Sequence, residues 1–134
     1  MQAALELQKA ILSALSDHAP LVQALGGAKF HDLTPMRTAY PYVTFGPSSI
    51  HDWSTDTEQG SEHFFTLNIW SGAKGKAEAL VLIEAVRKAL VEMEPAMNGF
   101  SLVNLRQESA EIRFDDDLGA HHGLMRFRAV IEPA

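Results

Sequence analysis

The stretch "EHFFTLNIW", residues 62–70, decides the fold, because its side chains follow a period of two residues. Phe65, Leu67 and Ile69 fall on one side of an extended chain, and the residues between them fall on the other. This alternation is typical of a β-strand that covers a core with one face. We therefore predict a strand over about 62–70.

A second strand is predicted just before it, in "YVTFGPSSI", residues 42–50. The dipeptide Gly46-Pro47 predicts a bend or bulge there, because proline cannot donate a hydrogen bond to a neighbouring strand. The intervening stretch "WSTDTEQGS", residues 53–61, is polar and turn-forming. Together these segments indicate an antiparallel hairpin with a long tip.

The clearest helical pattern covers residues 75–93, where apolar side chains recur at i, i+3, i+4 and i+7 in one stripe. Leu80 and Val91 fall outside that stripe, on the flank beside Arg87. A flank that is partly apolar indicates a second contact, such as another subunit.

Two more helices are predicted near the start of the chain, over about 2–16 and 20–25. Residues 28–41 show little periodicity and contain two prolines, which predicts an irregular connector. The last third predicts two further strands, over about 102–114 and 123–132, joined by a turn.

The expected fold class is therefore α+β. One four-stranded, mainly antiparallel sheet would carry its helices on one face, in the order α-(α)-β-β-α-β-β. The chain of 134 residues is expected to form one domain over residues 1–134.

Composition excludes several kinds of chemistry. The chain has no cysteine, so disulfides, thiolate metal sites and cysteine nucleophiles are absent. Its net charge is −6, which disfavours a protein that grips nucleic acid by neutralising phosphates. An acidic surface would still suit contact with DNA that slides past without binding.

The histidines raise a metal hypothesis. If the hairpin pairs around its tip, His51 and His63 could face each other at its mouth, with Asp52 or Glu62 nearby, a ligand set that suits zinc or iron. No H-E-x-x-H spacing supports it, and the preferred interpretation is a polar hairpin end. His121 and its neighbour at 122 would point to opposite faces of a strand.

Catalytic patterns are weaker still. His51, Asp52 and Ser54 are residue types of a catalytic triad, but neighbours at one strand end splay apart instead of forming a relay. The chain contains no G-x-S-x-G elbow, and "DDDLGAHHG" lacks the spacing of a calcium loop. Trp53 and Trp70 could each cap the core or anchor an interface. We expect no enzyme activity and no cofactor.

Several stretches resemble one family over almost the whole chain. They are "YPYVTFG", "DWST", "FTLNIWS", "GKAEALVLIEAVRKAL", "LVNLR" and "HHGLMRFRAVIE". The chain resembles the small tail-completion, or tail terminator, proteins of long-tailed bacteriophages and of phage-like gene transfer agents. The resemblance implies a structural protein that forms a ring, typically a hexamer, on the head-proximal end of the tail tube. Such a ring stops tube polymerisation and offers the surface to which the head docks.

The same resemblance implies the partners. They are further copies of the chain, the tail tube protein and a head-tail connector or stopper protein, with DNA passing through the lumen without specific binding and no membrane involved. The protein would belong to the tail of a virion or phage-like particle assembled in the host cytoplasm. Two alternatives remain: a head-side stopper or adaptor of the head-tail connector, and a small metal-dependent enzyme using His51 and His63.

Exposure patterns suggest which residues contact a neighbouring subunit or the tube. The expected contacts lie in the hairpin tip, on one helix flank and in the second turn: Asp52, Trp53, Asp56, Glu58, Leu80, Arg87, Val91, Asp115, Asp116 and His121.

Overall fold

The computed structural model describes residues 2–33 and 38–134. It contains three helices and five strands in these residues: α1 (Gln2–Asp17), α2 (Ala19–Leu25), β1 (Phe30–His31), β2 (Tyr42–Asp52), β3 (Ser61–Ser71), α3 (Ala77–Val91), β4 (Phe100–Asp115) and β5 (Ala120–Pro133). None of these helices has the length and apolar character needed to cross a membrane.

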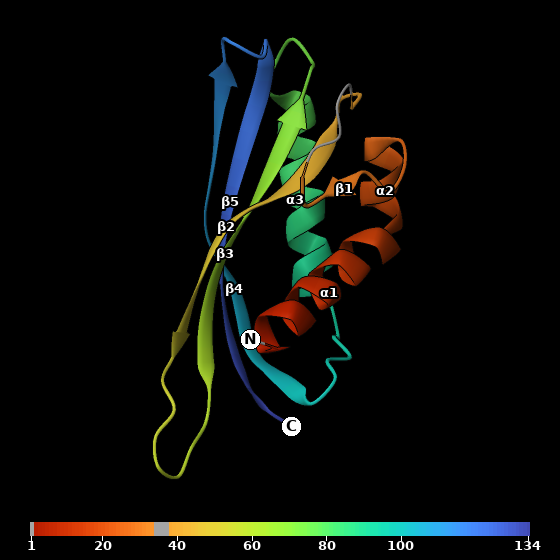
Figure 1. Cartoon of the computed structure of the whole chain (residues 1–134). Coiled ribbons are helices and arrows are strands. Elements are labelled where there is room, and N and C mark those ends of the chain that lie inside the picture. Colours follow the sequence, from red (N-terminus) through yellow and green to blue (C-terminus); the bar gives the residue numbers. More distant parts are fainter. Residues whose placement is uncertain (1, 34–37) are drawn as a thin grey trace.

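The strands form one sheet in the order β1-β2-β3-β5-β4. The three pairings from β2 to β4 are all antiparallel, and β1 pairs with β2 in parallel. All three helices lie on one side of the sheet, and no described helix covers the other side, the bare face (Figure 1). The predicted α+β class, with helices on one face, is confirmed.

The predicted number of strands was wrong, because β1 was assigned to the connector. This strand has only two residues, Phe30 and His31, which pair with Val43 and Thr44 of β2. Two residues are too few to show a period in sequence, and only the partner strand makes them a strand. Residues 34–37 of the predicted connector lie outside the described residues.

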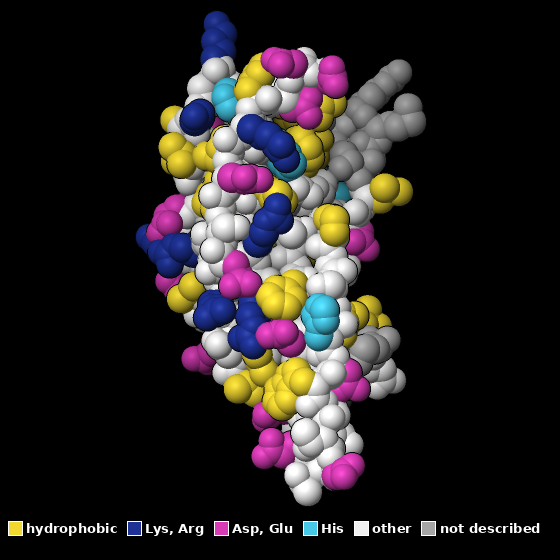
Figure 2. Space-filling model, turned by 90° about the vertical axis from the view of Figure 1, so that its left-hand side faces the viewer, with side chains coloured by type: hydrophobic (Ala, Val, Ile, Leu, Met, Phe, Trp, Pro, Cys, Tyr) yellow, Lys and Arg dark blue, Asp and Glu magenta, His cyan; other side chains and the backbone are white. Residues whose placement is uncertain are grey.

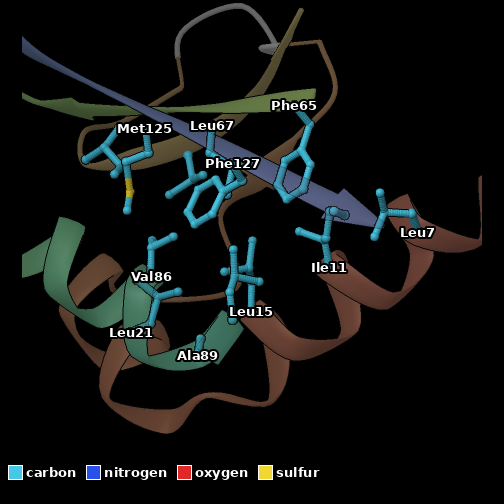
Figure 3. Close-up of a cluster of buried hydrophobic side chains, with 14 of the residues drawn as sticks. Leu7, Ile11, Leu15, Leu21, Phe65, Leu67, Val86, Ala89, Met125 and Phe127 are labelled. Carbon is cyan, nitrogen blue, oxygen red and sulfur yellow. The ribbon is translucent and has the colours of Figure 1, made fainter. Parts of the chain in front are cut away.

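The core lies between the helices and the two central strands (Figure 3). In β3 every second residue is buried, including Phe65, Leu67 and Ile69, as the alternation predicted. Helix α1 contributes Leu7, Ile11 and Leu15 at helical spacing, and α3 contributes an equivalent stripe: Ala79, Leu82, Val86, Ala89 and Leu90.

The predicted bend in β2 is confirmed as a shift of register between Phe45 and Ser48. There the Thr66 hydroxyl donates a hydrogen bond to the carbonyl oxygen of Pro47 at 2.9 Å. A Cβ atom at Gly46 would lie 2.3 Å from the same hydroxyl oxygen, so the strand crosses Thr66 only with glycine at this position.

Strand β4 differs from the central strands in its burial. It is 16 residues long, yet none of its residues is fully buried. It forms the outer edge of the sheet, beyond β5. Its apolar side chains therefore belong to a face that the helix layer of the chain covers only in part.

Candidate assembly surfaces

The two long loops lie at opposite ends of the sheet. The β2–β3 tip connects Asp52 to Ser61, which form the last pair of the two strands. It lies at the end of the sheet where Ser61 pairs with Ile131 of β5. The β4–β5 turn lies beside the opposite end of β3, where Ser71 pairs with His121. Figure 1 shows the tip at the bottom of the molecule and the turn at the top.

The β2–β3 tip is held by its own hydrogen bonds. The Asp52 carboxylate accepts from the backbone N–H of Ser54 at 2.9 Å and from its hydroxyl at 2.6 Å. These bonds lower the pKa of Asp52, so it remains an anion at neutral pH. Asp56 and Glu58 are exposed beyond this base, which places negative charge at the end of the hairpin.

Trp53 contributes to the base of its own hairpin, and its role as an interface anchor stays a prediction. Its backbone N–H donates a hydrogen bond to the carbonyl oxygen of Gly60 at 3.1 Å. Its ring lies so close to Gly60 that a Cβ atom added to this glycine would be 2.5 Å from Cζ2 of the indole. The indole therefore packs across the hairpin base, but it remains 39% exposed. Trp70 lies on the bare face of the sheet and donates to the Thr44 hydroxyl at 3.1 Å.

The β4–β5 turn carries three successive aspartates with different roles. Asp115 organises the turn, because its carboxylate accepts from the Leu118 N–H at 3.0 Å and its carbonyl accepts from the Gly119 N–H at 2.8 Å. Asp116 and Asp117 are exposed. Gly119 has φ of 63°, a left-handed conformation that favours glycine.

His121 is placed differently from the other expected contact residues. Its side chain is 6% exposed and lies on the helix side of the sheet, with Nδ1 3.2 Å from the carbonyl oxygen of Ala73. His122 lies on the opposite face, stacked on Trp70 with ring centroids 4.1 Å apart. The prediction that these neighbours point to opposite faces is confirmed, and His121 packs inside its own subunit.

The flank of α3 is as apolar as the sequence indicated. Leu80 and Val91 are exposed on either side of Arg87, which donates from Nε to the Glu84 carboxylate at 3.0 Å. This contact lowers the pKa of Glu84 and raises that of Arg87. Ile83, on the same flank, packs against Gly123 of β5. A Cβ atom added to this glycine would lie 3.2 Å from Cδ1 of Ile83.

The alternative in which His51 and His63 face each other in a metal site was wrong. His51 is in register with Glu62, and His63 with Ile50, so the two imidazoles lie on opposite faces of the sheet. His63 is buried and shares a hydrogen bond with the Ser61 hydroxyl at 2.7 Å, and burial lowers its pKa. No group of three possible ligands from the His, Cys, Asp and Glu side chains was found among the described residues.

Among the described residues, His51, Asp52 and Ser54 also form no catalytic relay. Nε2 of His51 lies 3.4 Å from the Ser49 hydroxyl, whereas Asp52 is bound to Ser54. The strand pleat separates His51 from Asp52, because successive side chains point to opposite faces.

The bare face of the sheet is a surface that sequence reasoning missed. Aromatic rings form a row along it: Tyr40, just before β2, stacks on Tyr42, Tyr42 lies tilted against Trp70, and Trp70 stacks on His122. Arg128 forms an ion pair with Glu62 on the same face. Figure 2 shows basic, acidic and apolar side chains mixed over this face. Only the pairing of the strands brings these positions together, so no pattern local in sequence could have shown them.

Comparison with known proteins places the chain in a family. The family described as "Tail completion protein gp17" matches residues 9–132. The tail completion protein gp17 of Bacillus phage SPP1 is 26% identical over 125 residues, which cover 93% of this chain and 91% of that protein.

Solved structures agree with this placement. A chain in the structure "Virion of native gene transfer agent (GTA) particle" superposes with a TM-score of 0.84 at 30% identity, covering 94% of each chain. The "Structure of bacteriophage SPP1 gp17 protein" superposes with a TM-score of 0.69 at 25% identity, covering 96% of this chain and 91% of that one. The resemblance seen in the sequence is thus confirmed, and the chain belongs to the tail completion protein gp17 family, a family of structural proteins and not of enzymes.

Proposed function

We propose that this protein is a tail terminator of a phage tail or phage-like particle. Copies of it form a ring, a hexamer in this proposal, on the head-proximal end of the tail tube. The ring stops tube polymerisation and offers the surface to which a head-tail connector or stopper protein docks.

The placement of the two loops carries this proposal. A terminator needs two contact surfaces, one toward the tube and one toward the head. Here the tip between Asp52 and Gly60 and the turn between Asp115 and Ala120 lie at opposite ends of one continuous sheet. The sheet can hold both loops at a set separation, because β3 and β5 pair along the whole length of β3.

The charge of the chain supports its expected relation to DNA. Each copy has a net charge of −6, so six copies together would carry about −36. A surface of like charge repels phosphate, which suits DNA that passes through the ring without specific binding. The expected contact residues of the tip and turn remain part of the proposal, except His121, whose buried side chain serves its own subunit.

A capping experiment tests the proposal. The purified protein is first measured by native mass spectrometry and then added to polymerising tail tube protein, with tube lengths measured by electron microscopy. We expect a closed ring, found at one end of the tubes, and a tube length that falls as the protein concentration rises. A protein that remains monomeric beside tubes of unchanged length would contradict the proposal. Attachment to isolated heads instead of isolated tails would favour a stopper or adaptor.

A further inference from the structure

We propose that neighbouring copies join edge to edge, with the free part of β2 in one copy pairing with β4 of the next. In the same contact, the exposed flank of α1 packs against the exposed flank of α3. The contact is heterologous, so each copy uses both edges, and repetition of one contact generates a ring. This inference rests on the proposed ring and specifies the surfaces that build it.

Strand direction makes this pairing possible. Three antiparallel pairings separate β2 from β4, so these two strands run in opposite directions. A rotation about an axis along the strands preserves their direction, and it would place β4 of the next copy antiparallel to β2. Four strands, an even number, lie between the two contacts, so the antiparallel pattern can continue through any number of copies.

The β2 edge is open only along its second half. Strand β1 covers Val43 and Thr44, and Pro47 has no N–H to donate. Beyond it, residues 48–52 pair with β3 on one side and with no described strand on the other. An unpaired strand edge offers backbone hydrogen bonds to another chain.

A hollow beside this open edge offers room for a side chain of a neighbour. It has a volume of about 160 Å³ and lies between α1 and the sheet, with a mixed lining of apolar residues such as Leu7, Ile11 and Ile50 and polar ones such as Gln8 and Asp32. An apolar cavity of about 150 Å³ can hold one benzene ring. The hollow therefore has room for a single large side chain of an added strand, as in other cases of strand addition.

The β4 edge faces away from β5 and has no described partner strand. Shifts of register at 102/104 and 107/109 leave a regular segment between them, residues 104–107. The pairing runs from Ile50 through His63 and Ala129 to Leu105, so this segment lies level with the open half of β2.

The helix layer has exposed apolar flanks at the same two edges. On α1, Leu5 and Leu12 are exposed. They lie three and four residues from Gln8 and are therefore its neighbours on the helix surface. The side chain of Gln8 donates a hydrogen bond to Asp32, which follows β1. On α3, Leu80 and Val91 lie on the same flank as Ile83. The side chain of Ile83 lies against Gly123 of β5, and Gly123 pairs with Ile112 of β4. The apolar flanks of the helix layer thus lie toward the same two edges of the sheet, and the two layers indicate the same contact.

Blocking one edge at a time tests this contact. Leu5→Glu places a charge at the β2 edge, and Val91→Glu places one at the β4 edge. Val81→Glu is the matched control, since Val81 is on the same helix and 59% exposed against 62% for Val91. It lies about a quarter turn of the helix further from the β4 flank. Circular dichroism establishes that each variant is folded, and native mass spectrometry, with and without tail tubes, measures its assembly.

We expect each edge variant alone to remain monomeric and the control to form the wild-type ring. An equimolar mixture of the two edge variants should give a 1:1 dimer, because one chain keeps an intact β4 edge and the other an intact β2 edge. Hydrogen exchange of the amides at 49–52 and 104–107 should be slower in the wild-type ring than in the Val91→Glu monomer.

The outcomes separate this inference from the proposed function. Rings that form normally in both edge variants would overturn the contact and leave the terminator proposal intact. Equal exchange of those amides in ring and monomer would overturn the strand pairing. A wild-type protein that forms no ring, even with tail tubes, would overturn the proposed function and this inference with it.

Discussion

Strands β3 and β4 belong to the same sheet and yet differ in what covers them. Six of the 11 residues of β3 are buried, in strict alternation, whereas none of the 16 residues of β4 is. Both strands carry apolar residues at alternate positions, as in Phe65 and Leu67 of β3 and Ile112 and Phe114 of β4. The difference therefore comes from position in the sheet. Alternation predicts a strand with an apolar face, but only the tertiary structure shows whether the same chain covers that face.

The largest expected effect is a difference in the free energy of unfolding between alanine substitutions in β3 and in β4. Leu67→Ala should lower the free energy of unfolding by about 2–5 kcal/mol, because it opens a cavity in the packed core. Ile112→Ala in β4 should cost about 1 kcal/mol or less, because that side chain is only half-buried. Denaturant unfolding of the two variants measures both values. Equal losses would show that β4 is covered as fully as β3 in the isolated chain.

A smaller effect is expected where β2 crosses β3. Gly46→Ala should destabilise the protein by about 1–3 kcal/mol, because the new methyl group would meet the Thr66 side chain at 2.3 Å. Gly75→Ala is the matched control, since no atom lies within 4 Å of its added Cβ. Its unfolding free energy should stay within about 0.5 kcal/mol of wild type. A neutral Gly46→Ala variant would contradict the tight crossing.

The buried histidine of β3 predicts a dependence of stability on pH. Burial lowers the pKa of His63 from its ordinary value of 6.5, so the folded protein binds a proton there less readily than the unfolded chain. Stability from this group is complete above pH 6.5 and falls as the pH drops below it, at most by about 1.4 kcal/mol per pH unit.

Unfolding of wild type and His63→Gln between pH 7.5 and pH 5 measures this contribution. The variant should lose less stability over that range. The pKa of His122 on the bare face is also lowered by burial, so a part of the loss should remain. An identical pH profile in the two proteins would show that His63 does not sense the pH.

The smallest effect on stability is expected at the hairpin tip that joins β2 to β3. Replacing Asp56 and Glu58 together by lysine should leave the unfolding free energy and the ring unchanged, because both side chains are exposed at the tip. In the proposed function, the same change should weaken either tube capping or head docking, whichever the tip performs. Capping and docking assays measured side by side decide between them. Full activity in both assays would exclude the tip carboxylates from either contact.

Much of the fold was predictable from local patterns. The period of two in residues 62–70 predicted β3, and the apolar stripe of residues 75–93 predicted α3 to within two residues at each end. The bend at Gly46-Pro47 was also predictable, because proline removes a hydrogen-bond donor wherever it occurs. Strand β1 was missed, because its two residues carry no period of their own.

Of the candidate surfaces, the sequence indicated the apolar flank of Leu80 and Val91, because helical spacing is a local property. It could not place His51 and His63 on opposite faces, since that depends on how β2 pairs with β3. The same limit applies to the aromatic row of the bare face, whose members come from segments far apart in the chain.

The sequence by itself determined the longer helices and strands, the face that each turns to the core and the family to which the chain belongs. Only the tertiary structure decided that β4 is an edge and that the two loops lie at opposite ends. The physical reason is that periodicity reports the environment along one segment. Strand order, register and the partner across an edge depend on contacts between segments, which no local pattern contains.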